Sequence, residues 1–136
     1  MQASTLNIDN RLSELERAFA WVDHSLAAMQ ADDRLRNDIK VVLDEVFANI
    51  VRHGGDGSTT LQLHASTQAM VLDIRDNTAP FNPLDVPPPN LDGSHLDRPA
   101  GGLGLVLVRQ LSDEQSYCRD GDRNHLRLVW YRRASS

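Results

Sequence analysis

Residues 42–54, VLDEVFANIVRHG, decide the fold of this chain. Together with Leu35 and Ile39, their apolar residues recur every three or four positions, which is the period of an amphipathic helix that buries one stripe. Glu45 and Asn49 are one helical turn apart, so both side chains leave the helix on one face, at the edge of the apolar stripe. A carboxylate and a carboxamide in these places could act as a base and a metal-bound oxygen ligand, or they could be solvated residues of a helix flank.

Composition narrows the class of protein. The chain has 136 residues, of which 40% are hydrophobic and 24% charged, and this predicts one soluble globular domain over residues 1–136. The net charge is −5 and the basic residues are scattered, so nucleic acid is not expected as a partner. No apolar run is long enough to span a membrane and no secretory signal is visible, so we expect a cytoplasmic protein without membrane contact. The single Cys118 allows no internal disulfide and supplies no metal cluster.

Apolar periodicity and turn residues predict two further helices and five strands. The first helix is expected from the cap-type residues Asp9 and Asn10 to about Gln30. The central helix should follow the capping pair 32–33 and end near Arg52, and the last helix should follow Gly104. The strands are expected over about residues 3–8, 60–65, 70–75, 115–118 and 126–131. The predicted fold class is therefore α+β: a two-layer sandwich, with a mostly antiparallel sheet and three helices on one face.

A proline-rich stretch interrupts this pattern. All six prolines lie between Pro80 and Pro99, so the stretch cannot be a helix or a central strand. Long loops without regular structure inside compact domains are usually functional or disordered. We therefore predict that residues 78–101 form a lid over a site.

The central helix carries the first group of residues that could do chemistry. Arg52 and His53 extend the face of Glu45 and Asn49. Magnesium takes oxygen ligands and usually shares its shell with substrate phosphates, so one Asn oxygen suffices if a nucleotide supplies the rest. A neighbouring Glu could accept a proton from a hydroxyl group or a water.

Two further groups follow along the chain. Asp76 comes at the end of a predicted strand, where an Asp alone is most simply a turn residue. Its functional interpretation is a carboxylate that accepts from an exocyclic amino group, such as that of adenine. Gly101, Gly102 and Gly104 come before a helix, where unpaired N–H groups and the helix dipole favour phosphate, although a flexible turn has the same composition.

The three groups follow one another in a fixed order, and in this order the chain resembles the GHKL (Bergerat-fold) ATPases. Within them it is most similar to the anti-sigma factor serine kinases of sporulation and general stress. Residues 44–53, DEVFANIVRH, resemble their N box. Residues 73–83, DIRDNTAPFNP, resemble the first glycine box, and residues 98–108, RPAGGLGLVLV, the second. Residues 117–126 also fit, so the resemblance covers nearly the whole chain.

The resemblance implies a role for each residue. Glu45 would be the base that activates the substrate hydroxyl, Asn49 would coordinate Mg²⁺, and Asp76 would bind the adenine amino group of ATP. Backbone amides would hold the phosphates and Arg98 would reach the γ-phosphate. The expected nucleotide site is completed by Arg52, His53, Thr78, Gly101, Gly102, Gly104, Leu105 and Val106.

One residue departs from the family pattern. The first glycine box usually reads Asp-x-Gly, and here the third position is Thr78. Threonine disfavours a positive φ, so the pocket could be altered and its affinity for ATP reduced. Alternatively, the threonine hydroxyl could make a hydrogen bond of its own. The sequence leaves both possibilities open.

The resemblance implies a protein-serine/threonine kinase that uses ATP and sequesters a partner. It would phosphorylate an anti-sigma antagonist and hold a sigma factor or another target, and a homodimer is expected from the resemblance alone. A non-catalytic module that binds ATP and a partner protein is the alternative. The ATP-binding half of a histidine kinase is not expected, because His24 lacks the acidic residue and proline that follow a phosphoacceptor histidine.

Overall fold

A computed structural model describes residues 2–85 and 102–132, with the side chains of residues 102–105 left aside. Its helices are α1 (Leu15–Ala28), α2 (Asp33–Gly54) and α3 (Gly102–Leu111), with short 3-10 turns at Leu12–Glu14 and Pro83–Asp85. Its strands are β1 (Gln2–Asp9), β2 (Ser58–Ala65), β3 (Ala69–Asp76), β4 (Glu114–Asp120) and β5 (Arg123–Tyr131). The end of the predicted lid, residues 86–101, lies outside the described residues.

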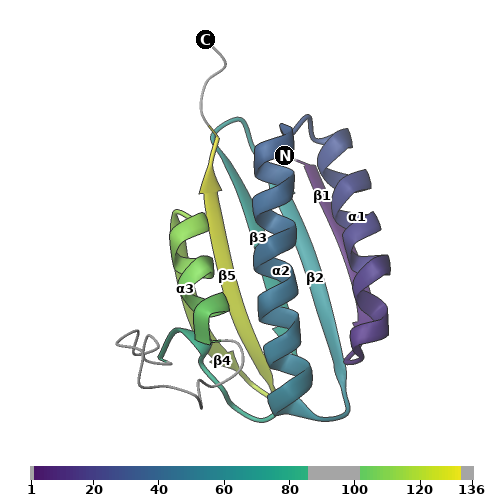
Figure 1. Ribbon diagram of the computed structural model, residues 1–136, viewed down its shortest axis with the longest axis vertical. Helices are drawn as coiled ribbons and strands as arrows, with labels where there is room; N and C mark the ends of the chain where they lie inside the picture. The colour runs from purple at the N-terminus through teal and green to yellow at the C-terminus, as the bar shows by residue number, and fades with distance from the viewer. Residues whose placement is uncertain (1, 86–101, 133–136) are drawn as a thin grey trace.

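The strands form one sheet in the order β1-β2-β3-β5-β4. Every neighbouring pair among these strands is antiparallel, so the described sheet is antiparallel throughout rather than mixed. The three helices α1, α2 and α3 all lie on the same face of the sheet (Figure 1). The predicted two-layer α+β sandwich is therefore confirmed.

Helix α2 follows the sequence pattern closely. The Asp32 side chain caps its first turn by accepting a hydrogen bond from the Leu35 backbone N–H at 2.8 Å. The buried stripe faces the sheet and includes Ile39, Val42, Leu43, Val46 and Phe47. Burial of each such side chain contributes about 1.5–3 kcal/mol, so this stripe holds the helix on the sheet. Gly55, with a φ of 67°, ends the helix.

The predicted start of the first helix is wrong. Asp9 ends β1, and neither it nor Asn10 caps a helix; the 3-10 turn Leu12–Glu14 intervenes, and α1 begins at Leu15. Asn10 is instead buried, and its Oδ1 accepts a hydrogen bond from the Thr59 hydroxyl at 2.6 Å. Asn10 therefore does not cap a helix; its side chain links the end of β1 to Thr59 of β2.

Candidate functional site

A cavity of about 220 Å³ lies where the end of α2 meets the end of β3. In Figure 1 these two ends and the beginning of α3 lie at the same, lower end of the molecule. Apolar and polar side chains line the cavity together, which is typical of ligand sites in which a few polar groups give orientation. The polar or aromatic residues in its lining are Asn49, His53, Asp76, Thr78, Phe81, Tyr117 and Asn124.

Asp76, the predicted adenine ligand, is 5% exposed and is held by its neighbours through one oxygen. Its Oδ1 accepts hydrogen bonds from the Thr78 backbone N–H at 3.1 Å, from the Thr78 hydroxyl, and from Asn124 Nδ2 at 3.0 Å. Its Oδ2 accepts no hydrogen bond within residues 2–85 and 102–132. Because Asp76 lines the cavity, Oδ2 is the oxygen that a ligand would meet.

Thr78 does not require the backbone conformation of a glycine. Among the described residues other than glycine, a positive φ occurs at Gln30 and not at Thr78. The backbone of Thr78 is therefore not strained by a positive φ. Its hydroxyl donates to Asp76, and this settles the open question of what the side chain does. Space for it comes from Gly54, where an added Cβ would collide with Thr78 Cγ2 and lie 2.7 Å from Thr78 Cβ.

Asn49, the predicted metal ligand, is 4% exposed and lines the cavity. Its Nδ2 donates to the Glu45 backbone oxygen at 3.0 Å, which fixes the orientation of the carboxamide. Its Oδ1 accepts from Arg52 Nη1 at 2.9 Å, so a positively charged guanidinium lies beside the oxygen that would ligate a metal. The half-buried Glu45 is not part of the cavity lining.

His53 and Phe81 form one wall of the cavity. Their rings stack with centroids 4.7 Å apart and planes inclined by 23°. His53 belongs to the last turn of α2, whereas Phe81 belongs to the segment that follows β3. The stack therefore joins the predicted N box to the predicted first glycine box.

The remaining predicted residues come from the second glycine box. Arg98 and Gly101 lie outside the described residues. The backbone of Gly102, Gly104 and Leu105 forms the first turn of α3, where N–H groups lack partners within the helix. Val106, the next residue, is half-buried, and α3 packs against α2.

Sequence reasoning missed Asn124 and Tyr117, which line the cavity from β5 and β4. Asn124 is opposite Asp76 because β3 pairs with β5, which is distant in sequence. One signal was available: Asn124 continues the inward alternation of Leu126 and Leu128, so a carboxamide there should lie at the end of the core.

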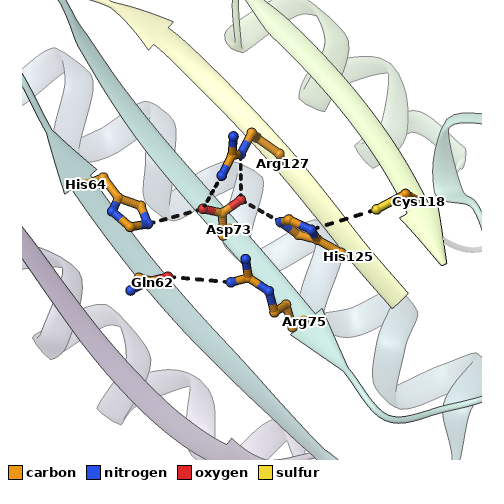
Figure 2. Close-up of polar contacts among 7 residues, drawn as sticks. All are labelled: Gln62, His64, Asp73, Arg75, Cys118, His125 and Arg127. Carbon is orange, nitrogen blue, oxygen red and sulfur yellow. Dashed lines mark hydrogen bonds and ion pairs between the residues drawn. The ribbon is translucent and has the colours of Figure 1, made fainter. Parts of the chain in front are cut away.

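A second polar cluster lies on the face of the sheet opposite the helices (Figure 2). Asp73 is completely buried at its centre, with its Oδ1 2.8 Å from Arg127 Nε and 2.6 Å from His125 Nε2, and its Oδ2 3.2 Å from His64 Nε2. Burial alone would raise the pKa of the Asp73 carboxyl, but hydrogen bonds and positive charge from Arg127 and His125 outweigh it and lower the pKa below 3.8. The same contact raises the pKa of Arg127. This cluster joins three neighbouring strands and is separate from the cavity.

In residues 2–85 and 102–132, no three or more His, Cys, Asp or Glu side chains gather in a way that could hold a metal ion. Within the same residues, no helix has the length and apolar character needed to cross a membrane.

The chain is similar to known proteins over nearly its whole length. A sequence model of the histidine kinase-like ATPase domain family matches residues 8–130. Serine/threonine-protein kinase BtrW of Bordetella bronchiseptica is 30% identical over 132 residues, which cover 94% of this chain and 93% of that protein.

Two solved structures share the fold. The RsbU and RsbW domains of a Mycobacterium tuberculosis protein superpose with a TM-score of 0.68 at 15% identity, over 96% of this chain and 32% of that one. The histidine kinase AdeS of Acinetobacter baumannii superposes with a TM-score of 0.56 at 17% identity, over 96% of this chain and 68% of that one. At these identities the likeness concerns the fold alone.

Proposed function

The chain belongs to the family of histidine kinase-like ATPase domains. From this premise we propose that it is a GHKL protein-serine/threonine kinase of the anti-sigma factor type that uses Mg-ATP. Its proposed substrate is a small antagonist protein. Its second proposed partner is a sigma factor or another regulatory target, which it sequesters. The 30% identity to a protein named as a serine/threonine kinase supports a catalytic role. We further propose one domain over residues 1–136, a cytoplasmic location and a homodimer.

The observation that carries the proposal is the Asp76 carboxylate at the cavity. Oδ1 is held by three donors, Oδ2 accepts no hydrogen bond from the described residues, and Asp76 lines the cavity. An acceptor so held suits a ligand amino group, and the exocyclic amino group of adenine is such a donor. The first turn of α3 lies at the same end of the molecule and offers N–H groups to phosphates.

The residues near the cavity fit a magnesium ion that is held mainly by nucleotide phosphates. Asn49 offers one buried, oriented oxygen, and magnesium needs few protein ligands when phosphates and waters fill the rest of its shell. The guanidinium of Arg52, which donates to the same oxygen, would repel a cation there. When bound, the ion would neutralise charge on the phosphates.

Glu45 is the proposed base. It lies one turn before Asn49 on α2 and is half-buried outside the cavity lining, where the hydroxyl group of a protein substrate could approach from solvent. Acceptance of the hydroxyl proton would make the oxygen a better nucleophile. Phosphoryl transfer depends mostly on positioning and charge stabilisation, so a small domain can carry it out.

Glu45→Gln tests the kinase proposal because it keeps the shape of the side chain and removes the base. ATP affinity should be unchanged, while transfer of radiolabelled phosphate to the cognate antagonist should fall by about 10²–10⁴-fold. Asn49→Ala should weaken Mg²⁺-dependent ATP binding and transfer together. Asp44→Asn is a matched control, because Asp44 is the exposed neighbour of Glu45.

Two outcomes would contradict the kinase proposal. Transfer by Glu45→Gln at the wild-type rate would remove Glu45 from the mechanism. If the wild-type protein binds Mg-ATP and transfers no phosphate to the antagonist, the non-catalytic binding module is the better description.

A further inference from the structure

Asn124 is a buried carboxamide at the start of β5 whose donor side is fully used. It is opposite Asp76 in the β3–β5 ladder. Its Nδ2 donates to Asp76 Oδ1 at 3.0 Å and to the Ala79 backbone oxygen at 2.9 Å. The carboxamide therefore joins the carboxylate to the segment that follows it.

The acceptor side of Asn124 is used as well. Its Oδ1 accepts from the Phe81 backbone N–H at 3.2 Å, from Arg119 Nη1 at 3.3 Å, and from the Tyr117 hydroxyl. Three segments, which are the end of β3, residues 79–81 and β4, thus meet on one side chain. Because donors and acceptors are both matched, the carboxamide can neither flip nor turn without losing several hydrogen bonds.

Thr78 restrains the same oxygen of the Asp76 carboxylate. Its backbone N–H and hydroxyl both donate to Asp76 Oδ1, which already accepts from Asn124. With three donors on one oxygen, rotation of the carboxylate would break all three hydrogen bonds. The carboxylate consequently presents Oδ2 to the cavity in a fixed direction.

We propose that Asn124 and Thr78 are positioning residues that set the base selectivity of the cavity. They hold Asp76 so that Oδ2 favours a purine that carries an exocyclic amino group over one that lacks it. A fixed acceptor loses little conformational freedom on binding and penalises a base that cannot donate to it. This inference rests on the proposed binding of ATP and adds two residues that act through Asp76 on the choice of base.

The test compares ATP with purine riboside triphosphate, which has the same rings, sugar and phosphates and lacks the amino group. Calorimetric titrations with Mg²⁺ would measure the affinity of both nucleotides for the wild-type protein, Thr78→Val and Asn124→Leu. We expect the wild type to prefer ATP. Each variant should reduce that preference roughly tenfold, because it removes one of the three donors that hold Asp76 Oδ1. Thr78→Ser keeps the hydroxyl and should keep the preference.

A double-mutant design separates positioning from ordinary structural support. In an Asp76→Ala background, Thr78→Val and Asn124→Leu should leave the ratio of the two affinities unchanged, since they act through the missing carboxylate. Thr60→Val is the matched control, because the Thr60 hydroxyl donates to Asn7 Oδ1 at 2.7 Å between β1 and β2 and does not line the cavity. Urea unfolding would verify that each variant folds. If Asn124→Leu does not fold, Thr78→Val and Thr78→Ser decide the question.

Equal weakening of both nucleotides by Thr78→Val would overturn the inference, because a merely structural contact behaves in that way. An unchanged preference in Thr78→Val would overturn it too. If Asp76→Ala abolishes the preference and Thr78→Val does not reduce it, this inference fails while the proposed ATP site stands. If the wild-type protein binds neither nucleotide, both fail.

Discussion

Asp73→Asn should destabilise the protein although Asp73 is remote from the cavity. The Asp73 side chain is 0% exposed, whereas its partner side chains Arg127, His64 and His125 are 49%, 25% and 15% exposed. Loss of one partner from a fully buried ion pair costs about 3–5 kcal/mol. Arg127 can regain water here, so the cost should be closer to that of a hydrogen bond to a charged group, about 1.5–3 kcal/mol.

The difference in stability between the wild-type protein and Asp73→Asn should also depend on pH. Because the pKa of Asp73 is lower in the folded protein than its ordinary value of 3.8, the unfolded chain binds the proton more readily. The stability that the ionised carboxylate contributes is therefore fully present above about pH 4 and is lost as the pH falls through the lower, folded-state pKa. One such group changes the free energy of unfolding by at most about 1.4 kcal/mol per pH unit.

Urea unfolding followed by fluorescence of the two tryptophans, Trp21 and Trp130, would measure this at several pH values. Asp23→Asn is the control, because Asp23 pairs with Lys40 at 3.0 Å and is 48% exposed. The control should cost no more than about 1 kcal/mol. The reasoning would be refuted if Asp73→Asn cost no more than the control at neutral pH, or if its cost stayed constant as the pH fell below 4.

Two further changes act at the cavity. Gly54→Ala should lower the free energy of unfolding by about 1–3 kcal/mol, because the added Cβ would collide with Thr78. In urea unfolding, Thr78→Gly should remove most of this cost. If Gly54→Ala costs the same with Thr78 and with Gly at position 78, the two residues are not in steric conflict. Arg52→Met takes the guanidinium away from Asn49 Oδ1. In a titration with Mg²⁺ at fixed ATP, half-maximal binding should then need less Mg²⁺. A higher Mg²⁺ requirement would show that Arg52 assists metal binding.

The fold was predictable because its signals are local. The Asp32 cap, the buried stripe of α2 and the terminal Gly55 all lie within α2 or directly beside it in sequence. Strand alternation gave five strands, and their ends in the structure extend a few residues beyond the predicted ones. The start of α1 was not predictable in this way, because Asn10 serves a partner, Thr59, that is distant in sequence.

The candidate site was predictable only in part. Residues on one helix face or at one strand end could be grouped from spacing, and the structure brings Asn49, His53 and Asp76 to one cavity. Four residues of an α-helix turn through about 400°, so Glu45 and Asn49 differ in direction by about 40°. Glu45 also lies about 6 Å further from the C-terminal end of α2 than Asn49, and the cavity lining includes Asn49 but not Glu45.

Thr78 shows why the remainder required the structure. Its departure from the Asp-x-Gly pattern leaves a choice between strain and a new hydrogen bond. The acceptor, Asp76, is two residues away, but the sequence does not show that the fold leaves room for the side chain. Gly54, on another element, supplies the space, and Asp76 receives the hydroxyl. Asn124 restrains the same oxygen of Asp76 from a strand that pairs across the sheet. The Asp-x-Gly pattern is therefore broken at a proposed functional site, and Gly54 and Asn124, which the fold brings next to Thr78 and Asp76, compensate for it. Thr78 changes how Asp76 is held, and the pocket remains.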